Sequence, residues 1–167
     1  MTPTSGPDRN SQALAGLRIA VGFLFLIFSE YKVFGRAFTF GGGFEYWINR
    51  FLTDQGAYPF MVPILRDFVL PHARPIALVV AYGELAIGVA LIGGLLSRVA
   101  SACGLVYMLA LLFSANYPGP GVPLWQYFGA ALEHLVFALC FTAFALADPA
   151  AAWSIPAYRR SWRKGAV

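Results

Sequence analysis

Charged residues, cysteines and histidines are scarce in this sequence, and their scarcity excludes several kinds of protein. Only 12% of the 167 residues are charged and 59% are hydrophobic, a composition outside the usual range of soluble domains. With His72 and His134 as the two histidines, a haem held by a pair of histidines is not expected. Cys103 and Cys140 have neither CxxC nor metal-ligand spacing, which indicates buried thiols and no metal site.

Several functional signatures are also missing. The sequence contains no Gly-rich phosphate loop, no serine-nucleophile motif and no series of intramembrane acids like that of an ion pump. Its net charge is +4, but the basic residues cluster around hydrophobic segments instead of forming a stripe, which argues against nucleic-acid binding. The opening residues, MTPTSGPDRNSQ, lack the basic region and cleavage site of a signal peptide. We therefore expect the first apolar run to be retained.

Long apolar runs are the most prominent feature that is present. A helix needs about 20 residues to cross the hydrocarbon core of a bilayer. Four stretches approach this length, at about residues 14–34, 75–96, 99–117 and 124–146. The sequence predicts an all-α, integral-membrane four-helix bundle, built as a single domain over residues 1–167, with an extended and partly helical interfacial segment between its first two helices.

That interfacial segment covers about residues 35–74. Its first half carries apolar residues at helical spacing, which predicts a short amphipathic helix lying at the membrane surface; these residues are Phe44, Trp47, Ile48, Phe51 and Leu52. Its second half, residues 58–70, is apolar but is divided by Pro59 and Pro63. Two interpretations of the segment stay open: part of it dips into the bilayer, or all of it forms a cap that covers the bundle.

Orientation is predicted from the basic residues. Four crossings place both termini and the connection between the second and third spans on one side of the membrane. The basic residues on that side are Arg9, Arg18, Arg98, Arg159, Arg160, Arg163 and Lys164. The positive-inside rule then puts both termini in the cytoplasm. Because Arg18 lies within the first run, its side chain is expected to extend toward that surface.

Two acids lie inside the apolar runs and need a structural or functional reason, because a carboxylate at that depth costs a few kcal/mol. They are Glu84 and Glu133, and both are predicted to lie in the same half of the bundle. His134 follows Glu133 but is turned by about 100° around the helix, so the two side chains cannot point at the same spot. Gly88, one turn from Glu84, is expected to let another helix approach closely.

Other polar residues fall near the same level, and two interpretations of the cluster stay open. In the first, the cluster holds the helices together, with Lys32 neutralising one carboxylate and His134 or Tyr82 bonding to another. In the second, it forms a site for a polar head group such as a quinone, which needs an apolar slot and hydrogen-bonding groups. The candidates for proton transfer are then Glu84, Glu133 and His134, and the candidates for binding are Lys32, Glu30 and Asn116.

Several of these residues resemble the pattern of the DoxX-like membrane proteins, which include DoxX-type and DoxD-type chains. The resemblance covers roughly residues 14–146. In LRIAVGFLFLIFSEYKVFG the similar positions are Arg18, Gly22, Phe25 and Lys32, and in ELAIGVALIGGLLSR they are Glu84, Gly88, Gly94, Leu95 and Arg98. Glu133 resembles the acidic residue of the family's last helix. The segment between Gly41 and His72 is longer than the usual connection and is a candidate docking surface.

The resemblance implies a bacterial inner-membrane protein with four helices, often associated with redox enzymes and in some members with quinone reduction. No covalently bound cofactor is expected. Two hypotheses follow, and the sequence leaves open whether the chain is itself an enzyme. In the first, it is a membrane subunit of an oxidoreductase with a quinone-type site. In the second, it is a noncatalytic accessory subunit that stabilises or attaches a larger electron-transfer complex.

Overall fold

All the regular elements of the described chain are helical, and three of them are long and apolar enough to cross a membrane. The computed structural model describes residues 8–54, 56–129, 132–147, 150 and 152–159. The three spans are α1 (Arg9–Phe34), α5 (Ala73–Gly93) and α6 (Ser97–Ser114). A further apolar helix, α8 (Leu132–Leu146), has 15 residues. The predicted all-α membrane fold is confirmed.

The helix ends differ from the predicted ones for local reasons. α1 begins at Arg9 because the Asp8 carboxylate accepts a hydrogen bond from the backbone N–H of Ser11 at 2.7 Å and so caps the first turn. α5 ends at Gly93 because Gly94 adopts a left-handed conformation with φ of +67°. The hairpin between α5 and α6 therefore lies at residues 94–96, whereas the predicted spans 75–96 and 99–117 left residues 97–98 for it.

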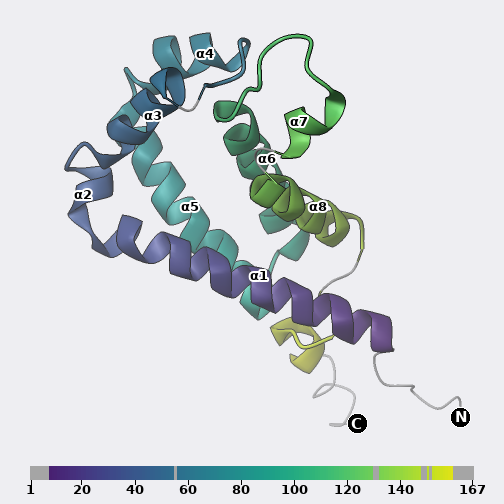
Figure 1. Cartoon of the computed structure of the whole chain (residues 1–167). Helices are drawn as coiled ribbons and strands as arrows, with labels where there is room; N and C mark the ends of the chain where they lie inside the picture. Colours follow the sequence, from purple (N-terminus) through teal and green to yellow (C-terminus); the bar gives the residue numbers. More distant parts are fainter. Residues whose placement is uncertain (1–7, 55, 130–131, 148–149, 151, 160–167) are drawn as a thin grey trace, which may run out of the picture.

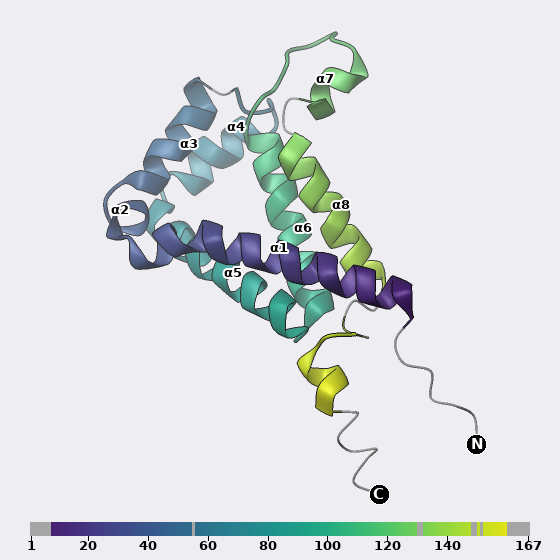
Figure 2. The same cartoon turned by 60° about the horizontal axis from the view of Figure 1, so that its bottom comes forward.

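The predicted fourth span, at about residues 124–146, corresponds to two described helices. The first is α7 (Leu124–Gly129) and the second is α8, while residues 130 and 131 lie outside the described residues. Figure 2 shows α7 to one side of the first turn of α8. Glu133 lies in the first described turn of α8, and its depth in a membrane stays a prediction.

The long helices pack as two pairs, α1 with α5 and α6 with α8 (Figure 1). In the first pair, a Cβ atom added to Gly22 would lie 3.0 Å from the carbonyl oxygen of Gly88, and the reverse distance is also 3.0 Å. In the second pair, a Cβ atom on Gly104 would lie 2.4 Å from the ring of Phe141. Close approach thus depends on glycine in both pairs, as predicted for Gly88.

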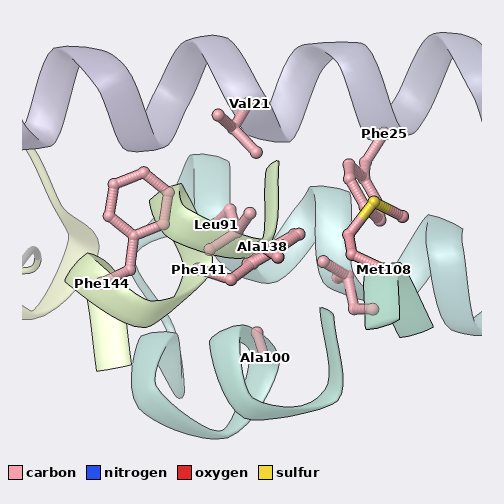
Figure 3. Close-up of a cluster of buried hydrophobic side chains, with 9 residues drawn as sticks. Val21, Phe25, Leu91, Ala100, Met108, Ala138, Phe141 and Phe144 are labelled. Carbon is pink, nitrogen blue, oxygen red and sulfur yellow. The ribbon is translucent and has the colours of Figure 1, made fainter. Parts of the chain in front are cut away.

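The two pairs meet in a buried core near the hairpin between α5 and α6 (Figure 3). Phe25 of α1 packs edge-on against Phe141 of α8, with ring centroids 5.2 Å apart. The other buried members of this core are Val21, Ile87, Leu91, Ala100, Met108, Ala138 and Phe144. This core fixes one end of the bundle, which we call the closed end.

Arg18 lies at the closed end and is fully buried. Its guanidinium donates hydrogen bonds to the carbonyl oxygens of Leu91 and Ile92 at the end of α5, and to that of Trp153 in the C-terminal segment at 2.7 Å. The Arg18 side chain is thus covered by protein, and whether this end of the bundle lies at a membrane surface stays a prediction. This long side chain donates to carbonyl oxygens at a helix end, where fewer backbone N–H partners are available.

At the opposite end, the two pairs diverge and four short helices cover them. These helices, which we call the cap, are α2 (Arg36–Thr39), α3 (Gly43–Thr53), α4 (Met61–Pro63) and the π-helix η1 (Ile64–Val69). Figure 2 shows α1 and α5 along one side of a triangle, α3 and α4 along the second, and α6 and α8 along the third.

The cap is attached to α5 through a second buried cluster, which includes Phe44, Ile48 and Leu65 of the cap and Ala77 and Ala81 of α5. The predicted amphipathic helix is confirmed as α3, with Phe44 and Ile48 on its buried face. How the cap lies relative to a bilayer, and on which side of the membrane, stays a prediction.

Candidate functional site

A buried ion pair joins α1 to α5 at the point where the two helix pairs diverge. The Lys32 ammonium lies 2.5 Å from Oε1 and 2.7 Å from Oε2 of Glu84. The two side chains are only 10% and 5% exposed. The interpretation in which Lys32 neutralises one of the two acids is thus confirmed. Such a pair is needed because an unpaired carboxylate in this apolar interior would be strongly unfavourable.

Tyr107 of α6 completes the cluster by donating its hydroxyl hydrogen to Oε1 of Glu84 at 2.5 Å. Sequence reasoning missed this residue and named Tyr82 instead. Tyr82 lies two positions before Glu84, on another face of α5, and its side chain is exposed. The signal for Tyr107 was a hydroxyl group in the middle of an apolar run, where a partner on another helix is expected. The cluster therefore connects three helices.

The cluster forms part of the wall of a cavity of about 680 Å³. The cavity lies between the two helix pairs and the cap, and it is lined by residues from α1, α2, α3, α4, η1, α5, α6 and α8. Its volume falls within the range of about 300–1,000 Å³ that is typical of small-molecule sites.

Most of the remaining lining is aromatic or aliphatic. The aromatic rings, apart from those of the tyrosines, come from Phe25, Phe28, Phe38, Phe44, Trp47, Phe51, Phe68 and Phe137. An apolar cavity with a few convergent polar groups is the usual architecture of a site for a flat, mostly apolar molecule. The cavity thus provides the apolar slot that the sequence interpretation required.

Glu133 and His134 also line this cavity, from the first turn of α8. Their side chains differ in burial, since Glu133 is 69% exposed and His134 is 24% exposed. His134 Nδ1 lies 3.9 Å from the Glu133 carboxylate, and this buried nitrogen has no hydrogen-bond partner among the described residues. Both side chains therefore border the cavity, and His134 is the more buried of the two.

The structure places the other two candidates away from the cavity lining. Glu30 is exposed on α1, and Asn116 lies after the end of α6 with a φ of +60°. Neither of them contributes to the cavity wall. Both were chosen because they lie near helix ends at a similar level, but level along the helix axis does not determine direction around it.

The connection between α3 and α4 is joined to the end of α6 and the loop that follows it by backbone hydrogen bonds and neighbouring rings. The N–H of Tyr58 donates to the Phe113 carbonyl oxygen at 3.0 Å, and the N–H of Tyr117 donates to that of Gly56 at 2.8 Å. The ring centroid of Tyr58 lies 4.9 Å from that of Tyr117. Burial raises the pKa of Tyr58, and the neighbouring Tyr127 and Tyr117 raise it further. These contacts hold the connection between α3 and α4 against the end of α6.

The polar cluster can act as a neutral site with both donor and acceptor capacity. The charges of Lys32 and Glu84 cancel, so the site does not select for a charged ligand. An ammonium group has three N–H donors, and Glu84 accepts two of them, which leaves one for a ligand. Tyr107 holds the carboxylate in place from the opposite helix pair.

Comparison with known proteins adds one finding. A family model described as DoxX matches residues 13–117, more than half of the chain. No curated protein and no solved structure matches the chain. The matched residues include Lys32, Glu84 and Tyr107, and they end before α7 and α8.

Proposed function

The chain belongs to the DoxX family of membrane proteins, and from this starting point we propose that it is the integral-membrane component of a quinone-linked redox complex. In this proposal a quinone head group binds in the cavity beside Lys32 and Glu84. The proposed location is a bacterial inner membrane with both termini in the cytoplasm, as the positive-inside rule predicts.

One observation carries the proposal: a buried ammonium group retains an unused donor at the wall of an apolar, aromatic cavity. Lys32 Nζ lies 5.3 Å from the ring centroid of Phe38 and 5.6 Å from that of Tyr31, both of which line the cavity. A quinone presents a flat ring for the aromatic walls and two carbonyl oxygens for donors. The uncharged ring also matches the cancelled charge of the ion pair.

The described residues fit such a head group at two places. Lys32 would donate its third N–H to one carbonyl oxygen, while Glu84, held by Tyr107, would keep the ammonium in position. His134 would offer a ring nitrogen from α8 to the second oxygen, because this nitrogen is buried without a partner among the described residues. When bound, a quinone supplies the capacity to accept two electrons and two protons.

The electrons would come from a partner protein. The two cysteines and two histidines provide neither a bis-His haem nor the four thiolates of an iron–sulfur cluster. The proposed contribution of this chain is to bind and orient the quinone, to exclude water with the cap, and to offer Glu84 and His134 as groups that hold a proton.

A second candidate is a noncatalytic accessory subunit, and the geometry of the cluster also favours it. Lys32, Glu84 and Tyr107 join three helices and both helix pairs, which is what a purely structural cluster would do. The two candidates differ in what removal of the charge on Glu84 should change: ligand binding in the first, and assembly alone in the second.

The test is quinone binding by the purified chain in lipid nanodiscs, measured by quenching of tryptophan fluorescence with a decyl-benzoquinone. Trp47 lines the cavity, so Trp47→Phe should remove most of the quenching, whereas Trp125→Phe, on the exposed α7, should not. Glu84→Gln should weaken binding about tenfold, as expected for the loss of one charge-assisted hydrogen bond. Glu45→Gln, outside the cavity lining, is the matched control.

The two candidates are then separated in the native complex. After purification of the complex from the membrane, quinone reduction is measured per assembled complex for the parent chain and for Glu84→Gln. Lower turnover in a fully assembled complex supports the quinone site. Unchanged turnover per complex with poorer assembly supports the accessory role and refutes the quinone site.

A further inference from the structure

Contacts on three sides of the cavity join the elements that surround it. At the closed end, the core around Phe25 and Phe141 fills the space between the helix pairs. On the α5 side, the cap is attached by the buried cluster that includes Phe44 and Leu65. On the α6 side, the backbone hydrogen bonds of Tyr58 join the cap to the bundle.

What remains open is an exposed rim that borders the cavity. Among the described lining residues, those with exposed side chains are Phe28 and Tyr31 of α1, Trp47 of α3, Ile64 and Phe68 of η1, and Glu133 of α8. Phe28 is 47% exposed, Ile64 46% and Phe68 60%. α1 and η1 therefore contribute an apolar part of the rim, whereas the charged Glu133 lies at the α8 side.

An apolar rim of this kind suits passage from a lipid phase better than passage from water. α1 is one of the helices long and apolar enough to span a membrane, and Phe28 lies within it. A polar molecule that entered from water across Phe28, Ile64 and Phe68 would lose its hydration against apolar side chains without replacement. An apolar chain would exchange one hydrocarbon environment for another at little cost.

We propose that the occupant of the cavity is a membrane-dissolved amphiphile, whose uncharged head lies beside Lys32 and Glu84 and whose apolar tail leaves between α1 and η1, across Phe28, Ile64 and Phe68. This inference rests on the proposed function and specifies its ligand class. The cavity volume of about 680 Å³ accommodates a drug-sized ligand, so it has room for the ring and the first part of a tail.

The test compares two probes with the same head: a dimethoxy-methyl-benzoquinone without a tail and its decyl derivative. Both are titrated into the full chain in phosphatidylcholine nanodiscs. Phe68→Asp places a carboxylate on the tail passage, and Phe28→Asn places a polar group on its opposite side. Phe34→Asp is the matched control, because Phe34 is an exposed residue of α1 outside the cavity lining.

We expect Phe68→Asp and Phe28→Asn to weaken binding of the decyl probe at least about tenfold, since polar groups are strongly disfavoured in a hydrocarbon path. The tailless probe should change less than about twofold, and Phe34→Asp should affect neither probe. Circular dichroism spectra and melting temperatures of the variants verify that each remains folded, and the two substitutions lie on different helices so that one can fail without loss of the test.

Two results would overturn the inference. If the substitutions weaken binding of both probes equally, the rim belongs to the head site. If they weaken binding of neither probe, the tail leaves the cavity elsewhere. A different result concerns the proposed function itself. If the tailless probe binds saturably and depends on Glu84, but neither substitution changes binding of the decyl probe, only the tail passage is refuted. If neither probe binds saturably, the quinone site is refuted as well.

Discussion

Removing only one member of the Lys32–Glu84 pair should destabilise the protein far more than removing both. The ammonium contacts both carboxylate oxygens, and both side chains are almost fully buried. Two unit charges about 4 Å apart attract by about 4 kcal/mol at an effective dielectric constant of about 20. Loss of one partner from a buried pair costs about 3–5 kcal/mol, whereas apolar replacement of both is often neutral.

The assay is a double-mutant cycle of Lys32→Met and Glu84→Leu, followed by thermal unfolding in detergent. At about 2–4 °C per kcal/mol for a chain of this size, each single variant should melt roughly 6–20 °C below the parent chain. The double variant should recover most of that loss. The matched control is the Arg50–Asp54 pair on α3, a partly exposed pair with an N–O distance of 3.5 Å, whose coupling should stay below about 0.5 kcal/mol.

The reasoning would be refuted in either of two ways. If the effects of Lys32→Met and Glu84→Leu simply add, the two charges do not stabilise each other. If the single variants melt with the parent chain, the pair is not buried as the structure describes it. A coupling free energy between Lys32 and Glu84 that is no larger than that between Arg50 and Asp54 would also refute the reasoning.

Three further predictions test other parts of the molecule. Gly104→Ala should cost about 1–3 kcal/mol because its Cβ would overlap the ring of Phe141, whereas Gly83→Ala, with nothing within 4 Å, should be neutral or slightly stabilising; thermal unfolding compares them. Arg18→Met should release the C-terminal segment, and limited proteolysis there should be about tenfold faster, as one lost charged hydrogen bond implies. The folded-state pKa of Tyr58 is raised above its ordinary value of 10.0. The stability that this shift contributes is complete below pH 10.0 and is lost as the pH rises through the folded-state pKa. Between about pH 8 and about pH 11, the melting temperature of Tyr58→Phe should therefore fall less than that of the parent chain.

The prediction of the ion pair succeeded because energy constrained it strongly. A carboxylate in an apolar helix needs a partner, and Lys32 was a nearby base at the right level of another helix. The buried charge of Arg18 also has partners, but of a different kind. It donates to backbone carbonyl oxygens at the end of α5 and in the C-terminal segment, and these groups come together only when the chain folds.

The depth of Glu133 stays a prediction, because residues 130 and 131, just before α8, lie outside the described residues. The structure adds that its side chain is 69% exposed, and hydrophobicity along the chain gives no indication of that direction. Tyr107 was missed for a related reason. Its importance depends on its direction around α6 and on the distance to Glu84, and neither is encoded in the spacing along one helix.

The sequence by itself determined the membrane class, the apolar spans, the amphipathic α3 and the requirement that Glu84 be paired, because burial of apolar groups and the cost of a buried charge depend on local composition. The tertiary structure alone decided that Tyr107 completes the cluster, that Arg18 donates to backbone carbonyl groups, and that a cavity exists. Those outcomes depend on how closely the glycines of α1 and α6 let each helix pair pack, and on how far the two pairs diverge beneath the cap. Distances between helices are set by packing across the whole molecule, so no single segment carries them.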